Sequence, residues 1–173
     1  PQNVFPDENG ELEQISVGVA QNALPDTPGA APISHKRGAM GRSWHDGRRD
    51  PRPEAVAWGL NFEEQWRYAL QIDPKFVFVS GWNEWTALRL ARWTAYTEAD
   101  ATVPGGLFID QYTQGYSRDC EPMRGGHGDN YYYQLASFVR RYKGVRPASK
   151  ATGPRPITID GSFDDWRDVT PEF

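Results

Sequence analysis

Two apolar runs separated by one helical pattern constrain the fold of this 173-residue chain most strongly. Residues 15–20 (ISVGVA) and 76–80 (FVFVS) have the continuous apolar character of buried strands, and the second run has no polar face. Between them, residues 61–72 carry apolar side chains at helical spacing, with Asn61 as the expected N-cap and Glu64 as its capping-box partner. An Asp-Pro dipeptide then ends the helix. The order strand, helix, strand predicts a βαβ unit, and hence a parallel sheet with helices outside it.

A second helix is predicted over residues 129–144. Asp129 is its expected N-cap, and Gly144 ends it after a last turn rich in Arg and Lys. Its apolar stripe consists of Tyr131, Tyr132, Leu135, Phe138, Val139 and Tyr142. The remaining segments are expected to be loops rich in Pro and Gly, with one short helix near residues 87–91; they are 1–12, 21–60 and 86–128.

These elements predict an α/β fold. Two strands and two helices make about a third of an eight-stranded barrel, so we expect residues 1–144 to be the C-terminal portion of a (β/α)8 TIM-type barrel. Residues 145–156 have the composition of a linker, and residues 157–173 are expected to start another domain. Because the chain opens on Pro1 without a methionine, we expect the N-terminal part of the same barrel to lie elsewhere and to be a partner of this one.

The composition argues against several classes of partner. A net charge of -4 provides no basic surface for nucleic acid, and no apolar run approaches the about 18 residues that a membrane span requires. The single Cys120 cannot form an internal disulfide, which fits a reducing compartment or a bacterial secreted protein that lacks disulfides. The seven Trp and eight Tyr residues suit sugar rings, because an aromatic face with a polar edge matches a saccharide, although large core residues would account for them too.

Glu84 is the strongest candidate for catalysis. In parallel α/β folds, ligands bind beyond the carboxyl ends of the strands, so the loop after residue 20, which includes Asn22, should approach Glu84. Trp82 and Trp85 flank this carboxylate, and partial desolvation between them would raise its pKa. Asn83 offers donors to a sugar hydroxyl or to a second carboxylate. The alternative is a structural Glu that binds the backbone of a neighbouring loop.

The loop at residues 41–50 (GRSWHDGRRD) is the next most suggestive stretch. Trp44, His45 and Asp46 supply a ring for stacking, a donor and an acceptor, as a sugar subsite requires. An arginine-rich surface turn is the alternative interpretation. Three His residues without ligand spacing predict no metal site. For His127, near the second helix, a structural role is expected.

Several of these residues carry a family resemblance. The sequence Gly-Trp-Asn-Glu-Trp at 81–85, the pair Glu121-Pro122 and the aromatic helix after it resemble the end of the barrel in WbsX-type proteins and in glycoside hydrolase family 99. The resemblance covers residues 75–144. It implies a (β/α)8 barrel that acts on glycosidic bonds, with Glu84 as a catalytic carboxylate.

One position departs from the family pattern. The motif usually carries a second Glu three residues after the first, where this chain has Ala87. A glycosidase needs two carboxyl groups, about 5 Å apart for retention and roughly 6.5–9.5 Å apart for inversion. The main candidates for the second group are therefore Asp110 and Glu121, the latter at the Glu-Pro position of the family, and the alternative is a residue in the N-terminal part of the barrel. Further acidic residues in reach of the same loops are Glu98, Asp119 and Asp129, which is expected to be used as a helix cap.

The segment ITIDGSFDDW at 157–166 resembles the opening strand of β-sandwich modules related to carbohydrate-binding module family 9. This resemblance covers only residues 157–173 and implies the start of a β-sandwich domain. It supports a multi-domain enzyme that acts on carbohydrates.

Together, these observations predict a secreted or periplasmic glycoside hydrolase that cleaves a polysaccharide or glycan without a cofactor. The alternatives are a non-catalytic glycan-binding barrel, favoured by Ala87, and glycosyl transfer, for which no phosphate-cradling Gly-rich loop is present. The expected catalytic residues are Glu84, Asp110 and Glu121, and the expected sugar-binding residues are Trp82, Asn83, Trp85, Trp44, His45, Asp46 and Asn22.

Overall fold

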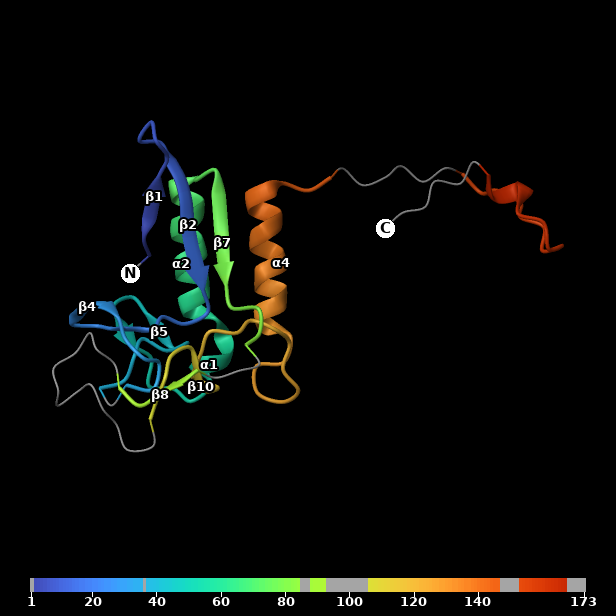
Figure 1. The fold of residues 1–173 in the computed structure, drawn as a ribbon. Coiled ribbons are helices and arrows are strands. Elements are labelled where there is room, and N and C mark those ends of the chain that lie inside the picture. The colour runs from blue at the N-terminus through green and yellow to red at the C-terminus, as the bar shows by residue number, and fades with distance from the viewer. Residues whose placement is uncertain (1, 36, 85–87, 93–105, 147–152, 168–173) are drawn as a thin grey trace.

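The computed structural model describes residues 2–35, 37–84, 88–92, 106–146 and 153–167. Its central element is a three-stranded sheet with the strand order β1 (Val4–Pro6), β2 (Leu12–Gly18), β7 (Phe76–Ser80). Strands β2 and β7 are parallel over five residue pairs, and α2 (Leu60–Ile72) lies in the connection between them (Figure 1). The predicted βαβ unit is therefore confirmed.

The first strand corrects the prediction of a loop over residues 1–12, because β1 pairs antiparallel with β2. The turn between them is built around Asp7, whose carboxylate accepts the backbone N–H groups of Asn9 and Glu11, at 2.9 Å each. A side chain that takes the place of a backbone acceptor in this way favours a tight reversal of the chain. As a result, β2 begins at Leu12 and ends at Gly18 rather than covering residues 15–20.

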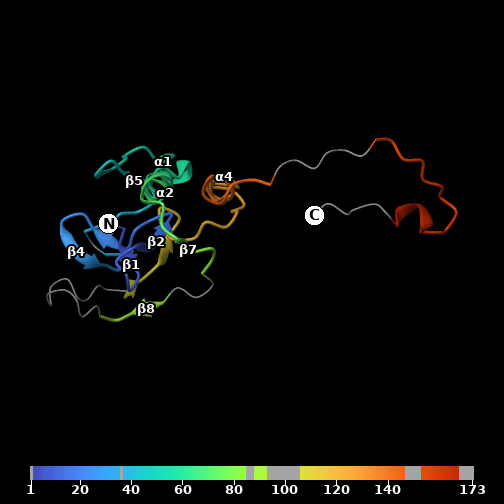
Figure 2. The same cartoon turned by 90° about the horizontal axis from the view of Figure 1, so that it is seen from above.

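Both long helices cover the same face of the sheet. Figure 2 shows α2 and α4 (Asn130–Lys143) on one side of the strands. Ile15 and Val17 of β2 belong to the core on that side and are almost fully buried. Trp66 of α2 stacks on Phe138 of α4, with ring centroids 5.5 Å apart and planes 3° apart. One continuous core therefore anchors both helices on the sheet.

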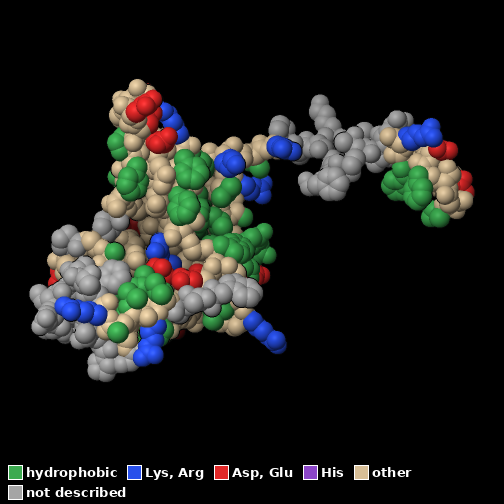
Figure 3. Space-filling view, viewed as in Figure 1, with side chains coloured by type: hydrophobic (Ala, Val, Ile, Leu, Met, Phe, Trp, Pro, Cys, Tyr) green, Lys and Arg blue, Asp and Glu red, His purple; other side chains and the backbone are tan. Residues whose placement is uncertain are grey.

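The other face of the sheet is open in the described part of the chain. Side chains alternate along a strand, so Phe76 and Phe78 point away from the helices, and each is 50% exposed. Phe5 of β1 shares this face by register and is 49% exposed. Figure 3 shows hydrophobic side chains spread over the sheet. The prediction of a wholly buried strand at 76–80 is therefore wrong for one of its two faces.

The fold is mixed α/β, with small sheets and two long helices, as the α/β prediction required. The residues that the structure describes form no closed barrel. The (β/α)8 barrel and the division of the chain at residues 144 and 156 stay predictions. An open inner face on a parallel β2–β7 pair with helices outside is the arrangement that one segment of such a barrel would have.

The stretches expected to be loops contain short hairpins and one short helix. The helix expected near residues 87–91 is absent from the described residues 88–92. Two of these residues instead pair antiparallel with residues 107–108. All these pieces lie beyond the carboxyl ends of β2 and β7 (Figure 1). They are β3 (Ala23–Leu24), β4 (Thr27–Ala30), β5 (Trp44–His45), β6 (Arg48–Arg49), α1 (Ala55–Trp58), β8 (Arg89–Leu90), β9 (Leu107–Phe108), β10 (Gln111–Thr113) and β11 (Tyr116–Ser117).

The helix ends differ in part from the prediction. Asn61 is not an N-cap, because α2 begins at Leu60, after Gly59, which takes a left-handed conformation with φ 70°. Asn61 is buried instead, and its side-chain amide donates to the carbonyl of Val19 at 3.1 Å. Asp129 does precede α4 and Gly144 does follow it, although Asp129 makes no side-chain capping bond. Asn61 thereby ties the start of α2 to the chain that leaves β2.

The C-terminal segment contains no strand in its described part. Residues 153–167 lie apart from the sheet and helices (Figures 1 and 2), with one 3₁₀ turn, η1 (Asp164–Trp166). The backbone N–H of Thr158 donates to the Asp165 carboxylate at 2.9 Å, so the expected opening strand is folded back on its own turn. The β-sandwich stays a prediction, since most of such a module would require further strands.

We predict that Trp66→Ala destabilises the chain by about 3–5 kcal/mol, because it empties the space between α2, α4 and the sheet. The free energy of unfolding in urea measures this loss. Tyr68→Ala on the same helix is the matched control, since Tyr68 is 40% exposed and its removal should cost far less. Equal losses for the two variants would contradict the packing described here.

Candidate active site

The candidate site is built where the chain leaves β7. Gly81 has φ 80°, and a Cβ at this position would lie 2.2 Å from the carbonyl oxygen of Arg118, so the site requires glycine. The close approach lets two segments pair. The backbone N–H of Cys120 donates to the carbonyl of Gly81 at 3.0 Å, and that of Glu121 donates to the carbonyl of Trp82 at 2.9 Å. Residues 81–84 and 118–121 are therefore held side by side at the carboxyl end of the sheet.

This pairing gathers four carboxylates from two distant parts of the sequence. Burial raises the pKa of Glu84, the negative charges of Asp110 and Asp119 raise it further, and Arg118 opposes them. Burial also raises the pKa of Asp119. A hydrogen bond from the backbone of Glu84 and the positive charge of Arg42 act in the opposite direction and lower that pKa. The four residues are Glu84, Asp110, Asp119 and Glu121. A carboxyl group with a raised pKa keeps its proton to higher pH, which suits it to general acid catalysis.

Each of the other three carboxylates is held by a polar partner. Asp110 forms an ion pair with Arg118 at 2.9 Å and accepts from Asn22 at 3.5 Å. Asp119 accepts from Gln111 at 2.9 Å. Glu121 accepts from Asn83, also at 2.9 Å. Asn22 thus contacts Asp110, whose charge acts on Glu84, and Asn83 contacts Glu121, while the predicted roles of these residues in binding and catalysis stay predictions.

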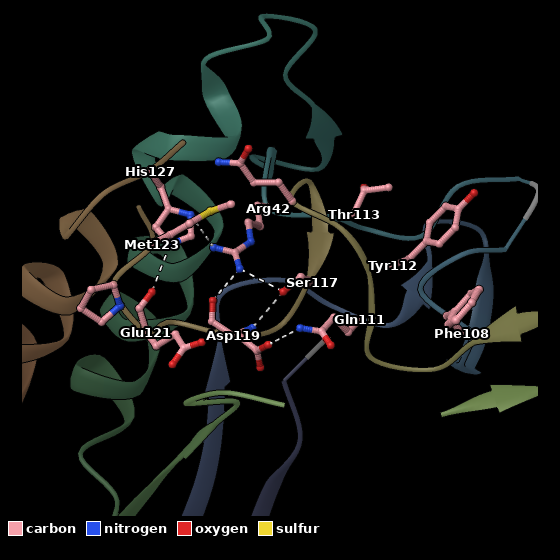
Figure 4. A pocket seen from close by; sticks show the side chains of 12 residues that line it. Arg42, Phe108, Gln111, Tyr112, Thr113, Ser117, Asp119, Glu121, Met123 and His127 are labelled. Carbon is pink, nitrogen blue, oxygen red and sulfur yellow. Dashed lines mark hydrogen bonds between the residues drawn. The ribbon is translucent and has the colours of Figure 1, made fainter. Parts of the chain in front are cut away.

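A cavity of about 450 Å³ opens beside the carboxylates. Asp119 and Glu121 line it, and across from them Phe108 and Tyr112 stack with ring centroids 5.6 Å apart and planes 22° apart (Figure 4). This volume is in the range of small-molecule sites. Glu84 is not among the described residues that line the cavity, but it is adjacent to Asp119, which is.

Arg42 is a central residue of the site that the sequence analysis did not identify. It is 2% exposed, yet it reaches the cavity and donates to the Ser117 hydroxyl at 3.1 Å and to the Asp119 carbonyl at 2.5 Å (Figure 4). Its guanidinium also lies 4.6 Å from the ring centroid of Tyr131 in α4 and 3.5 Å from Nδ1 of His127. One cation therefore connects the loop before β5, the segment after β11 and the start of α4.

The two tryptophans of the motif do not both flank the cavity. Trp82 turns its ring toward α4, where it meets Tyr132 edge-on at 6.1 Å, and it is 46% exposed. It is not among the described residues that line the cavity. Trp85, Ala87 and Glu98 lie outside the described residues, so their predicted roles stay predictions. The aromatic rings at the cavity are instead Phe108 and Tyr112, from a segment in which the sequence analysis selected only carboxylates.

The hairpin that carries Trp44, His45 and Asp46 lies beside α2. The backbone N–H of Asp46 donates to Glu64 of α2 at 2.7 Å, and the His45 ring lies 2.9 Å from the Asp46 carboxylate and 3.3 Å from Asp50. The hydrogen bond to Asp46 is the main cause that raises the pKa of His45. Trp44 lines a separate cavity next to α2, and none of the three lines the carboxylate cavity in the described part of the chain.

Two further residues have structural rather than chemical roles. Burial raises the pKa of the Cys120 thiol to about 11, so Cys120 is a packed side chain of low reactivity. Burial lowers the pKa of His127, whose Nε2 lies 3.2 Å from the carbonyl of Glu121. His127 therefore connects the carboxylate segment to α4, in agreement with its predicted structural role.

Among the residues that the structure describes, no group of three or more His, Cys, Asp or Glu side chains is arranged to hold a metal ion. No described helix combines the length and apolarity needed to cross a membrane. Comparison with models of protein families, with curated proteins and with solved structures produced no match to this chain.

We predict that Arg42→Met destabilises the chain by roughly 2–4 kcal/mol, because the buried acceptors at Ser117 and Asp119 lose their donor. Urea unfolding followed by tryptophan fluorescence measures the loss. Arg37→Met is the control: its pair with Asp26 is long, at 3.4 Å, and partly exposed, so about 0.5 kcal/mol or less should be lost. A similar small loss at Arg42 would contradict its role as the connecting residue.

Proposed function

We propose that this chain carries the catalytic carboxylates of a glycoside hydrolase. The observation that supports the proposal is the cluster of four carboxylates beside a cavity with a stacked aromatic pair. Carboxyl groups supply the acid and the base or nucleophile of glycosidic cleavage, and aromatic rings bind the C–H faces of sugars. The resemblance of Glu84 and Glu121-Pro122 to glycoside hydrolase family 99 points to the same reaction.

Glu84 acts as the general acid in this proposal. Its pKa is raised chiefly by burial, so it stays protonated to higher pH than an exposed Glu. The proton passes to the glycosidic oxygen as the bond from that oxygen to the anomeric carbon breaks, which gives a neutral alcohol as leaving group.

Glu121 is the best-placed second carboxylate. It lines the cavity, and the Asn83 amide fixes one of its oxygens at 2.9 Å. It attacks the anomeric carbon directly, or takes the proton of a water that does so. Asp110 is less suited, because its charge is already paired with Arg118 at 2.9 Å. Asp119 also lines the cavity but is only 7% exposed, and its negative charge helps to raise the pKa of Glu84.

Phe108 and Tyr112 bind the sugar in this proposal. Tyr112 is 55% exposed and stacks on Phe108, and the two rings line the cavity on the side away from Glu121 (Figure 4). Gln111 and Glu121 supply hydrogen-bonding groups at the same opening. A ring face opposed by polar groups is the arrangement that a pyranose requires.

A non-catalytic glycan-binding protein is the second candidate, and the Ala87 position favours it. A chain that had lost one of two catalytic carboxylates could keep the aromatic pair and still bind sugar. Both candidates predict saccharide binding, so only turnover separates them.

We predict that Glu84→Gln lowers turnover by about 10²–10⁴-fold, the usual contribution of a general acid, and leaves saccharide binding intact. Release of reducing ends from mannan, xylan, mixed-linkage β-glucan and pectin measures turnover. Glu63→Gln is the matched control, because Glu63 lies on the outside of α2 in an ion pair with Arg67 and should have no effect. A wild-type chain that binds but never cleaves would favour the non-catalytic alternative.

We further predict that Arg118→Met shifts the alkaline limb of the pH–activity profile to higher pH. A general acid works protonated, so activity falls as pH rises through its pKa. Arg118 lowers the pKa of Glu84, so its removal raises that pKa and delays the fall. Arg118→Lys retains the charge and should leave the limb close to its original position. A limb that does not move in the Met variant would exclude Glu84 as the titrating acid.

A further inference from the structure

Three aromatic side chains form an exposed cluster outside the cavity. Trp82 meets Tyr132 at 6.1 Å and 73°, and Tyr132 meets Tyr133 at 5.7 Å and 64°. Their exposed fractions are 46%, 44% and 65%, respectively. Figure 3 shows hydrophobic side chains gathered over the end of α4 where this cluster lies. We call these three residues the α4 aromatic surface.

The core does not account for this surface. Within the same helix, Tyr131 is fully buried and donates from its hydroxyl to the carbonyl of Val56 at 2.6 Å, and Phe138 stacks on Trp66. These two residues supply the packing of α4 against α2 and the sheet. Tyr132 and Tyr133 lie on other faces of the helix, where polar residues would keep it equally soluble. Contiguous exposed aromatic residues of this kind mark binding sites.

The α4 aromatic surface is continuous with the rim of the cavity. The carbonyl of Trp82 accepts the backbone N–H of Glu121, which lines the cavity. In Figure 4, Glu121 lies on one side of Asp119, and Phe108 and Tyr112 lie on the other. Aromatic rings are therefore found on both sides of the carboxylates, inside the cavity on one side and on the outer surface on the other.

The size and chemistry of the surface indicate its ligand. Aromatic side chains offer about 150–250 Å² each when fully buried, so three half-exposed rings present a few hundred Å² at most. This area is below the roughly 800 Å² per partner of a stable protein interface, but it matches a few sugar units.

We propose that the α4 aromatic surface binds a saccharide chain outside the cavity. The proposal takes only its class of ligand, a saccharide, from the proposed function, and it does not require that the chain cleave that saccharide. Removal of two stacking rings should lower the affinity about ten-fold.

Affinity gels containing mannan, xylan, mixed-linkage β-glucan or pectin test the proposal. The full chain with Glu84→Gln serves as the parent, so that no polysaccharide is cleaved during the run. We expect at least one polysaccharide to retard the parent, and Tyr132→Ala/Tyr133→Ala to weaken that retardation about ten-fold. Alanine is a better helix former than tyrosine, so α4 should remain folded, which circular dichroism checks. Tyr68→Ala, an exposed tyrosine of α2, is the matched control and should be retarded like the parent.

Three outcomes would overturn the proposal: no retardation of the folded parent by any of the four polysaccharides, equal retardation of the parent and the double variant, or self-association of the parent that the double variant abolishes. The last outcome would assign the surface to a second copy of the chain. Failure of the proposed function looks different, because a wild-type chain that releases no reducing ends can still show retardation that depends on Tyr132 and Tyr133.

Discussion

The parallel pairing of β2 with β7 is the constraint on which the site depends. The two strands run in the same direction over five residue pairs, so both release the chain at the same end of the sheet. Asn22 and Glu84, more than sixty residues apart in sequence, meet there through Asp110 for this reason. The pairing holds only because α2 crosses back over the sheet and buries Ile15 and Val17 beneath Trp66. The packing of one face therefore determines where the polar groups converge.

The position of the carboxylates then depends on one close contact between main chains. Gly81 lies so near the carbonyl of Arg118 that any side chain would separate the two segments. Once they are paired, Asp119 and Glu121 follow within three residues of Arg118, next to Asn83 and Glu84. A glycine without any chemical role thus sets the distance between the acidic groups. In a site of this kind, the geometry of the backbone determines where the side chains lie.

The sequence predicted the parts of this structure that depend on local patterns. Apolar periodicity identified α2, α4 and β7, and the rule that ligands bind beyond parallel strands predicted that the loop after residue 20 and Glu84 lie at the same edge of the sheet. It failed where tertiary contacts decide. Asn61 looks like a helix cap but bonds Val19 instead, and Phe78 looks buried although it is half exposed. Nothing in the run of arginines at 37–52 distinguishes Arg42 from Arg48, because only the fold shows which guanidinium points inward.

The burial of Arg42 follows from the charge of the site. Four carboxylates in one place repel each other, and burial increases the cost of each charge. Arg118 neutralises Asp110 from one side, and the positive charge of Arg42, held between Ser117 and Tyr131, lowers the pKa of Asp119 from the other. Two cations against four acids leave an excess of negative charge, which one proton can reduce. Burial and acidic neighbours raise the pKa of Glu84 as well as that of Asp119, so these two groups are suited to carry that proton, and the proposed function assigns it to Glu84.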